Sequence, residues 1–361
     1  MKPIAPDRVG SFFEPLDYNL AIASIIAGLT PGEAYTDNLE TPEVALLCYN
    51  HHLFLAGSPG DGTFNQVLNR FIGRTILPKF ADAGRDVFFL HVSSDSWHPH
   101  IDDILSGWYP VIRQRAYLEC TQHSQDWRDL LNPEFSLRPV NSKLLSQSHL
   151  ENMDYLKEEL CSERPTIDDF LQKSFGFCVI QDEQLAGWCL SEYNTGDRCE
   201  VGVATVDTYQ RQGLGTVTTL ALLEHAFSHG YHRVGWHSWK RNIPSVALAL
   251  RTGFNEVQDY SIYLCALNLA IQFALHGDDH RSVGAYQEAM TWYEKAISID
   301  TAPGWVFFNA ARCLALMGES KKAFDHLLLA IKRGFDDFEQ FLQEPDLVPL
   351  HANPAWESLF Q

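Results

Sequence analysis

The 361-residue sequence predicts an α/β (α+β) protein in which a mixed, twisted sheet is followed by an all-α segment. Three observations predict this class. Runs rich in β-branched and aromatic residues alternate with helical stripes between residues 43 and 264. A strand-like run at 200–206 passes through a turn with two glycines into a helical stripe at 216–228. From residue 268 onward the pattern is helical throughout, with small residues at a fixed spacing.

The predicted strands are apolar, β-branched or aromatic runs bounded by turn formers. They are residues 43–58 (one or two strands), 86–92, 135–145, 175–180, 185–190, 200–206, 233–238 and 257–264. The predicted helices carry apolar residues three and four apart, so that one face can be buried. They are residues 15–28, 63–83, 100–114, 150–160, 166–173, with Thr166 as N-cap, and 216–228. Residues 175–190 predict a hairpin that turns at 182–184.

The turn at 210–216 has the sequence QRQGLGT and joins a strand to a helix. Glycines let the backbone approach a ligand closely, and the free N–H groups of a first helical turn point at an anion. The turn therefore predicts a phosphate-binding site.

This stretch resembles the acetyl-coenzyme A binding core of the GNAT N-acetyltransferases. The family signature Gln/Arg-x-x-Gly-x-Gly/Ala is filled by Gln210, Gly213 and Gly215. A strand, an Asn, a small residue three positions later and a Gly-Phe pair complete the pattern, as Asn242, Ser245 and residues 253–254. The resemblance implies a mixed sheet whose central strands are splayed apart.

The order of elements also resembles one branch of that family, the zwittermicin A self-resistance acetyltransferases. In that branch a degenerate acetyltransferase-like half precedes the active half, and Glu200, Thr205 and Trp236 match its second half. We therefore expect three domains. They are a degenerate GNAT-like α/β domain at 1–125, a GNAT acetyltransferase domain at 126–266 and a helical domain at 267–361.

The helical segment contains a repeat. Gly284 and Gly318 are 34 residues apart, as are Ala289 and Ala323. This period and these small residues are typical of the tetratricopeptide repeat, in which they allow two helices to touch. Two repeats do not form a stable array alone, so residues 336–360 should add capping helices. Such a domain indicates a possible protein partner.

The resemblance also implies how acetyl-coenzyme A is held. The pantetheine arm would pair with the exposed edge of one splayed strand, and the pyrophosphate would lie on the amides of the turn. The implied cofactor-binding residues are Val203, Ala204, Thr205, Val206, Gln210, Arg211, Gln212, Gly213, Leu214, Gly215, Thr216, Asn242 and Ser245. A solvated side chain is the alternative for Arg211, and a helix N-cap is a compatible role for Asn242.

Catalysis needs a base that deprotonates the amine, and Glu200 is the candidate by resemblance. The structural alternative is an edge glutamate or an ion pair with Arg198. Many members of the family place a Tyr seven residues after the Asn, where it protonates the sulfur, but this position is Ala249 here. The general acid is therefore open, and the candidates are Ser245, Ser238, His237 and Tyr260. His237 can also be a base, a substrate contact or a core residue, and a thiolate can leave without an acid.

Composition limits the partners. The net charge of −19 argues against nucleic acid and anionic membranes and favours a cationic substrate. Neither a membrane-spanning run nor a signal peptide is evident, and eight cysteines without CxxC pairs predict a cytoplasmic protein. We predict no metal, because the histidines around Pro99 lack ligand spacing, and we interpret 57–62 as a surface turn.

The prediction is an acetyl-coenzyme A-dependent N-acetyltransferase that transfers acetyl directly to an amine of a small molecule in a ternary complex. One alternative is a protein N-acetyltransferase that recruits its target through the helical repeats. The other is an inactive acyl-coenzyme A sensor or scaffold, which the missing Tyr would explain.

Overall fold

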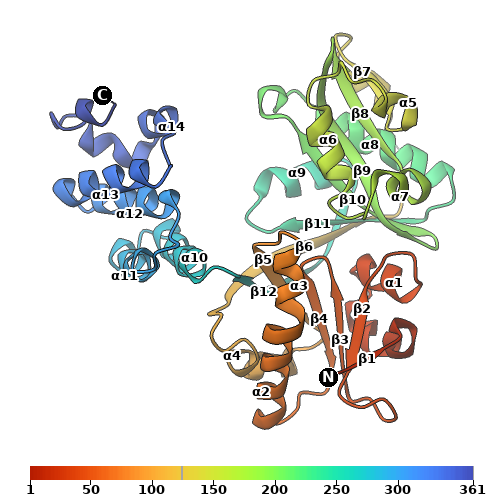
Figure 1. Cartoon of the computed structure of the whole chain (residues 1–361). Coiled ribbons are helices and arrows are strands. Elements are labelled where there is room, and N and C mark those ends of the chain that lie inside the picture. The colour runs from red at the N-terminus through yellow and green to blue at the C-terminus, as the bar shows by residue number, and fades with distance from the viewer. Residues whose placement is uncertain (123–124, 361) are drawn as a thin grey trace. The chain divides into compact units, whose positions relative to one another are not determined.

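The structure is a computed structural model that describes residues 1–122 and 125–360 (Figure 1). In these residues the strands form a 12-stranded sheet in the order β1-β2-β3-β4-β5-β12-β6-β11-β10-β9-β8-β7. Their bounds are β1 Lys2–Ile4, β2 Glu33–Thr36, β3 Val44–Tyr49, β4 His52–Gly57, β5 Val87–Val92, β6 Val111–Cys120, β7 Ser136–Pro139, β8 Gly176–Gln181, β9 Gln184–Thr195, β10 Arg198–Thr205, β11 Arg233–Trp239 and β12 Asn255–Ala266. The predicted mixed sheet is thus present.

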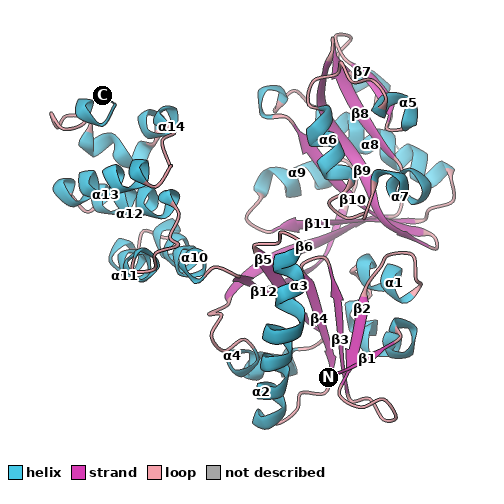
Figure 2. Ribbon diagram, in the orientation of Figure 1, coloured by secondary structure: helices cyan, strands magenta, loops and turns pink. Residues whose placement is uncertain are grey.

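The helices alternate with these strands and then continue alone toward the C-terminus (Figure 2). They are α1 Leu20–Ile26, α2 Gly62–Phe71, α3 Leu77–Asp82, α4 Ile101–Ile104, α5 Ser142–Leu145, α6 Met153–Leu160, α7 Ile167–Lys173, α8 Leu214–Ser228, α9 Ile243–Arg251, α10 Leu269–Ser282, α11 Tyr286–Ile297, α12 Gly304–Leu316, α13 Ser320–Lys332 and α14 Phe338–Gln343.

The chain divides into two compact units. One comprises Met1–Pro59, Leu90–Trp97 and Arg113–Ile262, and every strand contributes residues to it. The other comprises Gly60–Phe89, His98–Ile112 and Tyr263–Gln361. Because both units are discontinuous in sequence, they do not follow the expected consecutive domains 1–125, 126–266 and 267–361, which stay a prediction.

Two predicted helices have different bounds in the structure. The helix expected at 15–28 is a 3-10 helix, Pro6–Leu16, followed by α1. Pro15 and Leu16 end that 3-10 helix, α1 begins only at Leu20 after its N-cap Asn19, and Gly28 with a φ of 70° follows its end. The helix expected at 63–83 is continuous but changes type, with a π-helical stretch, Ile72–Ile76, between α2 and α3. Pro78 lies in the first turn of α3 and cannot donate to the preceding turn, which explains this change.

The prediction of one helix over 100–114 was wrong. Helix α4 ends at Ile104, and Gly107 (φ 91°) and Tyr109 (φ 50°) turn the backbone out of helical conformation. Pro110 then precedes β6, a central strand that pairs antiparallel with β11. The first strand of the 126–266 region is likewise shorter than the expected 135–145, because Asn141 caps α5 and ends the extended run.

The strands and helices around the turn at 210–216 agree closely with the sequence pattern. Helices α6 and α7 cover one face of β8 and β9, and α8 covers the other. The hairpin of β8 and β9 turns at Asp182, and the Thr166 hydroxyl caps α7 by accepting from the Asp169 amide. Helix α8 is buried along most of its length, which explains its apolar sequence.

Two glycines at the predicted spacing follow C-terminal helices, and a third glycine lets two of these helices pack closely. Gly284 and Gly318 have positive φ angles of 77° and 79° and follow α10 and α12. A Cβ on Gly277 would lie 2.7 Å from the Tyr293 ring, so α10 and α11 can approach only because Gly277 lacks a side chain. None of the helices in the described residues combines the length and apolarity that a membrane crossing requires.

Candidate active site

Strands β10 and β11 part in the middle of the sheet. They pair in parallel over three residues, from Arg198↔Arg233 to Glu200↔Gly235. Beyond this point β11 continues to Trp239 on β6, and β10 continues to Thr205 on β9. We call this place the fork. The predicted splay of the central strands is therefore present, and the edge of β10 that faces the gap is residues 201–205.

Local sequence explains the fork. The register of β10 on β9 shifts between Arg198 and Glu200, and such a bulge increases the local twist. Gly235 leaves room on the other side. A Cβ there would lie 3.0 Å from the Tyr117 ring and 3.1 Å from Cγ of Glu200. Gly235 thus lets the Glu200 side chain lie between the two strands.

The turn after β10 ends on an open helix N-terminus. Gly213 is the N-cap of α8 with a φ of 81°, and no side chain caps this end. A Cβ on Gly213 would meet nothing within 4 Å among the described residues. Gly215 packs closely instead, because its Cβ would lie 3.0 Å from Leu248. The amides of the first helical turn have no intrahelical acceptors, so this corner can bind an anion.

The predicted turn residues differ in where their side chains lie. The Gln210 side chain donates back to Asp207 at 2.7 Å, which stabilises the turn itself. Arg211 and Gln212 are exposed, and Arg211 has a positive φ of 62°. Leu214 and Thr216 are buried, so only their amides can face a ligand. The turn at 57–62, which we interpreted as a surface turn, has no such free helix N-terminus. The Asp61 carboxylate already caps α2 by accepting from the Phe64 amide.

Three of the predicted catalytic candidates form one hydrogen-bonded chain at the fork. The Glu200 carboxylate, 5% exposed, accepts from the Leu20 amide at 2.5 Å. The same oxygen is 3.2 Å from His237 Nε2, and His237 Nδ1 is 2.8 Å from the Tyr260 hydroxyl. With Glu200 ionised and the imidazole neutral, the imidazole proton is on Nε2 and Nδ1 accepts from the Tyr260 hydroxyl. The chain therefore runs from Tyr260 through His237 to Glu200.

Tyr260 is the protonated end of this chain. Burial, opposed by the charge of Arg115 and reinforced by that of Glu200, raises the pKa of Tyr260 to about 12. Its ring lies 4.9 Å from Tyr18, and Tyr117 lies 4.8 Å from His237, so aromatic rings enclose the imidazole. At neutral pH the Tyr260 hydroxyl can donate a proton but does not hold a negative charge.

The other candidates are engaged elsewhere. Trp236 Nε1 donates to the Ser245 hydroxyl at 3.1 Å, and the Ser238 hydroxyl donates to the Trp239 carbonyl at 3.2 Å. Asn242 caps α9 by accepting from the Ser245 amide, which confirms its N-cap role.

The ion pair considered between Glu200 and Arg198 is not formed. The Arg198 guanidinium pairs with Asp17 at 2.9 Å instead. The Glu200 carboxylate instead contacts the Leu20 amide and His237. The alternative of an ion pair with Arg198 is therefore wrong.

A cavity of about 230 Å³ lies beside the fork. It is lined by residues of β10 and β11 and by several residues that the sequence did not predict as part of the site. The polar lining residues are Asn19, His52, Arg115, Glu163, Glu192, Tyr193, Glu200 and His237. Burial, with the charge of His91 next, holds the pKa of His52 well below its usual range, so this imidazole is neutral. No local pattern in the sequence marks Glu163, Glu192 or Arg115, because they come from separate elements.

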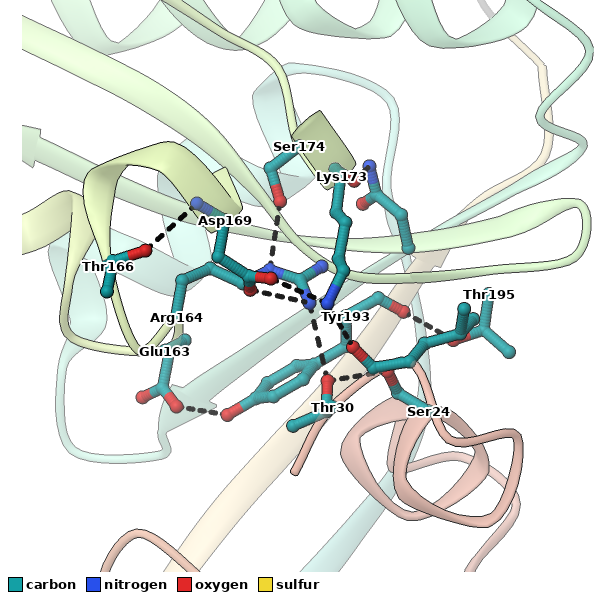
Figure 3. A network of polar contacts seen from close by, with 12 residues as sticks. Ser24, Thr30, Glu163, Arg164, Thr166, Asp169, Lys173, Ser174, Tyr193 and Thr195 are labelled. Carbon is teal, nitrogen blue, oxygen red and sulfur yellow. Dashed lines mark hydrogen bonds and ion pairs between the residues drawn. The ribbon is translucent and has the colours of Figure 1, made fainter. Parts of the chain in front are cut away.

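Figure 3 shows how Glu163 is positioned. The Tyr193 hydroxyl donates to its carboxylate. The neighbouring Arg164 donates to Ser174 at 3.1 Å and to Thr30 at 3.4 Å. These contacts tie the segment between α6 and α7 to β9 and to the residues that follow α1. Glu163 is therefore held at the cavity by a network rather than by a single contact.

Metal ligation has no geometric support in the part of the chain that is described, since no group of three or more His, Cys, Asp or Glu side chains could hold an ion there. The two histidines around Pro99 have other partners. His98 lies 2.5 Å from the Tyr263 hydroxyl, and His100 lies 2.9 Å from the Asn65 amide.

Comparison with known proteins gives a consistent answer. Residues 11–263 match the family model described as GNAT acetyltransferase. The Bacillus subtilis (strain 168) protein named Uncharacterized N-acetyltransferase YdfB is 25% identical over 244 residues, which cover 67% of this chain and 88% of that protein. A GCN5-related N-acetyltransferase-like protein from Streptococcus suis 89/1591 has a similar structure, with a TM-score of 0.54, 19% identity, and coverage of 72% of this chain and 97% of that one. At this identity the structural likeness supports the fold alone.

Proposed function

This chain belongs to the GNAT acetyltransferase family, and we propose that it transfers acetyl from acetyl-coenzyme A directly to an amine of a small molecule. One observation carries the proposal. The parted strands and a cavity of about 230 Å³ meet at one hydrogen-bonded Glu200–His237–Tyr260 chain, and the strand that carries Glu200 leads into the open N-terminus of α8.

The residues present fit the cofactor. The amides of residues 211–216 and the exposed Arg211 would hold the pyrophosphate, with open space around Gly213. The gap-facing backbone of Val203 to Val206 would pair with the pantetheine amides as an added strand. Asn242 and Ser245, at the start of α9 beside β11, would lie along the same arm. When bound, acetyl-coenzyme A supplies a thioester whose carbonyl is open to attack by an amine.

The chain's own residues would manage the proton. Glu200 lines the cavity and accepts a proton from the substrate ammonium, directly or through a water. His237 also lines the cavity and is the best placed of the four acid candidates. Tyr260 acts behind it as a positioning residue that fixes its tautomer. Water, or His237 in its imidazolium form, would supply the proton that the departing sulfur needs.

A covalent acyl-enzyme has no support at this site. Cys199, next to Glu200 on β10, is 1% exposed, and burial raises the pKa of its thiol, with the charge of Glu200 as a second cause. A buried protonated thiol is a poor nucleophile. Direct transfer in a ternary complex therefore agrees better with these residues.

The finer placements are also proposals. We propose that the chain resembles the zwittermicin A branch, that α10–α13 are tetratricopeptide-like repeats, and that the protein is cytoplasmic. Eight free cysteines, seven of them buried, support the last. The limited volume of the cavity, about 230 Å³, favours a small acceptor over a protein one.

The test is thiol release from acetyl-coenzyme A by the full chain, with a panel of small amines and with proteins. Acetylation of small amines supports the proposal. Acetylation of proteins alone would replace it with target recruitment through the helical repeats. Tight coenzyme A binding without release of thiol with any acceptor would indicate the inactive sensor or scaffold.

A further inference from the structure

The cavity beside the fork carries more negative charge than acetyl transfer requires. Three carboxylates line it, from the loop after α6 (Glu163), from β9 (Glu192) and from β10 (Glu200). The guanidinium of Arg115 is the one side chain of fixed positive charge among the lining residues of this cavity. A general base accounts for a single carboxylate, so two others need an explanation.

Glu192 is the least satisfied of the three. Among the described residues no donor hydrogen-bonds its carboxylate, although the side chain is largely enclosed. It stands directly opposite Glu200 across the β9–β10 pair, where like charges repel each other. A carboxylate that is partly buried in this position is costly unless an opposite charge is supplied.

The backbone of β10 makes room for this carboxylate. Gly202 is two residues after Glu200 and lies on the same face of the strand. A Cβ on Gly202 would lie only 2.2 Å from Oε1 of Glu192. The carboxylate is therefore placed over a backbone position that has no side chain, beside the fork and inside the cavity.

Resting on the function proposed above, we infer that the acceptor carries two cationic groups, and that Glu192 holds the ammonium that does not react. The amine to be acetylated then lies toward Glu200 and His237, and the second ammonium lies between Glu192 and Glu163. A short α,ω-diamine has this chemistry. The cavity of about 230 Å³ is many times the space that one water needs, so a short diamine fits it.

The electrostatics of Glu192 agree with this inference. Burial, followed by the charges of Glu163 and Glu200, holds the pKa of Glu192 well above its usual range. The other ionisable groups that face it are Glu159, Arg115, His52 and His237. An ammonium beside the carboxylate would favour its charged form and relieve the repulsion.

The experiment compares 1,4-diaminobutane with n-pentylamine, which has the same number of heavy atoms but a methyl group in place of one ammonium. The selectivity is the ratio of kcat/KM for the diamine to that for the monoamine. It is measured in the full chain, in Glu192→Gln and in Gly202→Ala, which keeps the charge but displaces the carboxylate. Glu183→Gln is the matched control, because it removes an exposed carboxylate from the hairpin turn that precedes β9.

We expect the unaltered chain to prefer the diamine, and the selectivity to fall at least about tenfold in Glu192→Gln and Gly202→Ala, since a charge-assisted hydrogen bond is lost. The control should keep the selectivity of the unaltered chain. An unchanged selectivity in both site variants, or a chain that acetylates the monoamine equally well, overturns the inference while leaving the acetyltransferase proposal standing.

Binding separates the two proposals if no amine is acetylated. Calorimetry with coenzyme A present then measures the affinity of the full chain for each amine. Diamine binding that exceeds monoamine binding and depends on Glu192 supports the inference, although the proposed function has failed. Equal or undetectable binding of both amines overturns it.

Discussion

Gly213 lies at the corner where the structure leaves an open helix N-terminus, so a negative charge placed there tests the phosphate site directly. In Gly213→Asp the new carboxylate would occupy space that is open among the described residues. It would repel a pyrophosphate and compete for the same amides. Gly230→Asp is a matched control at the other end of α8. Gly230 is also exposed, has a φ of 87° and has nothing within 4 Å of its Cβ position.

The similar surroundings of Gly213 and Gly230 let us estimate how each variant changes stability and coenzyme A binding. Both variants force a non-glycine residue into left-handed conformation, at a cost of about 1–2 kcal/mol in the free energy of unfolding. Both change the net charge by −1. Only the variant at position 213 adds repulsion of about 1 kcal/mol for each unit charge at about 4 Å in water. Two pyrophosphate charges give about 2 kcal/mol, which corresponds to a Kd for coenzyme A about 30-fold higher.

The assay is calorimetric titration of coenzyme A into each variant at low and high salt. Gly213→Asp should bind about 30-fold more weakly at low salt, with a smaller difference at 1 M salt, where the repulsion is screened. Gly230→Asp should bind like the unaltered chain, although it should lose at least as much thermal stability, because its carboxylate lies at the negative end of the α8 dipole. If the two variants bind coenzyme A equally well, the phosphate site does not lie at this corner and our reasoning about the turn is refuted.

Three further predictions concern the fork. Glu200→Gln should lower kcat about 10²- to 10⁴-fold and remove the acidic limb of the pH–rate profile, because a general base is lost; an unchanged profile eliminates Glu200 as the base. Tyr260→Phe leaves His237 Nδ1 without its donor, so the free energy of unfolding should fall by about 1–3 kcal/mol and kcat should fall with it; equal kcat in both proteins would mean that Tyr260 does not position the imidazole. Because the folded-state pKa of Glu192 is raised, its contribution to stability is fully present below the unfolded value of about 4.3 and is lost as pH rises through the folded pKa. Glu192→Gln should therefore melt at a higher temperature than the unaltered chain at pH 8 and at a similar temperature near pH 4, and a pH-independent difference in Tm would contradict this.

The sequence predicts the elements of the site better than their partners. Strand β10, the glycine turn and α8 are local features that the sequence pattern can predict. Gly213 adopts a positive φ, which favours glycine, and α8 is buried, which requires apolar residues. The helix predicted over 100–114 is absent, because the prediction relied on apolar spacing and gave too little weight to Gly107 and Pro110. As a result, the sequence did not predict the central strand β6.

Contacts across long sequence separations leave no such trace. The Leu20 amide and the Glu200 carboxylate are 180 residues apart, and Asp17 takes Arg198 away from Glu200. The cross-strand pair of Glu192 and Glu200 depends on the register shift beside Arg198, because a shift of one residue would place them on opposite faces. Residue types at these positions do not reveal that register.

The bond from the Leu20 amide fixes the proposed base to a helix whose own core lies elsewhere, around Ile22 and Ile25. Enlarging or shrinking those aliphatic side chains would tilt α1 and move the donor, although neither residue touches the cavity's carboxylates. A mutational survey scored by turnover would then report the N-terminal core as functionally sensitive. A design that aims to keep activity should therefore leave unchanged the side chains that pack under α1, the helix that orients Glu200, as well as the residues around the reacting groups.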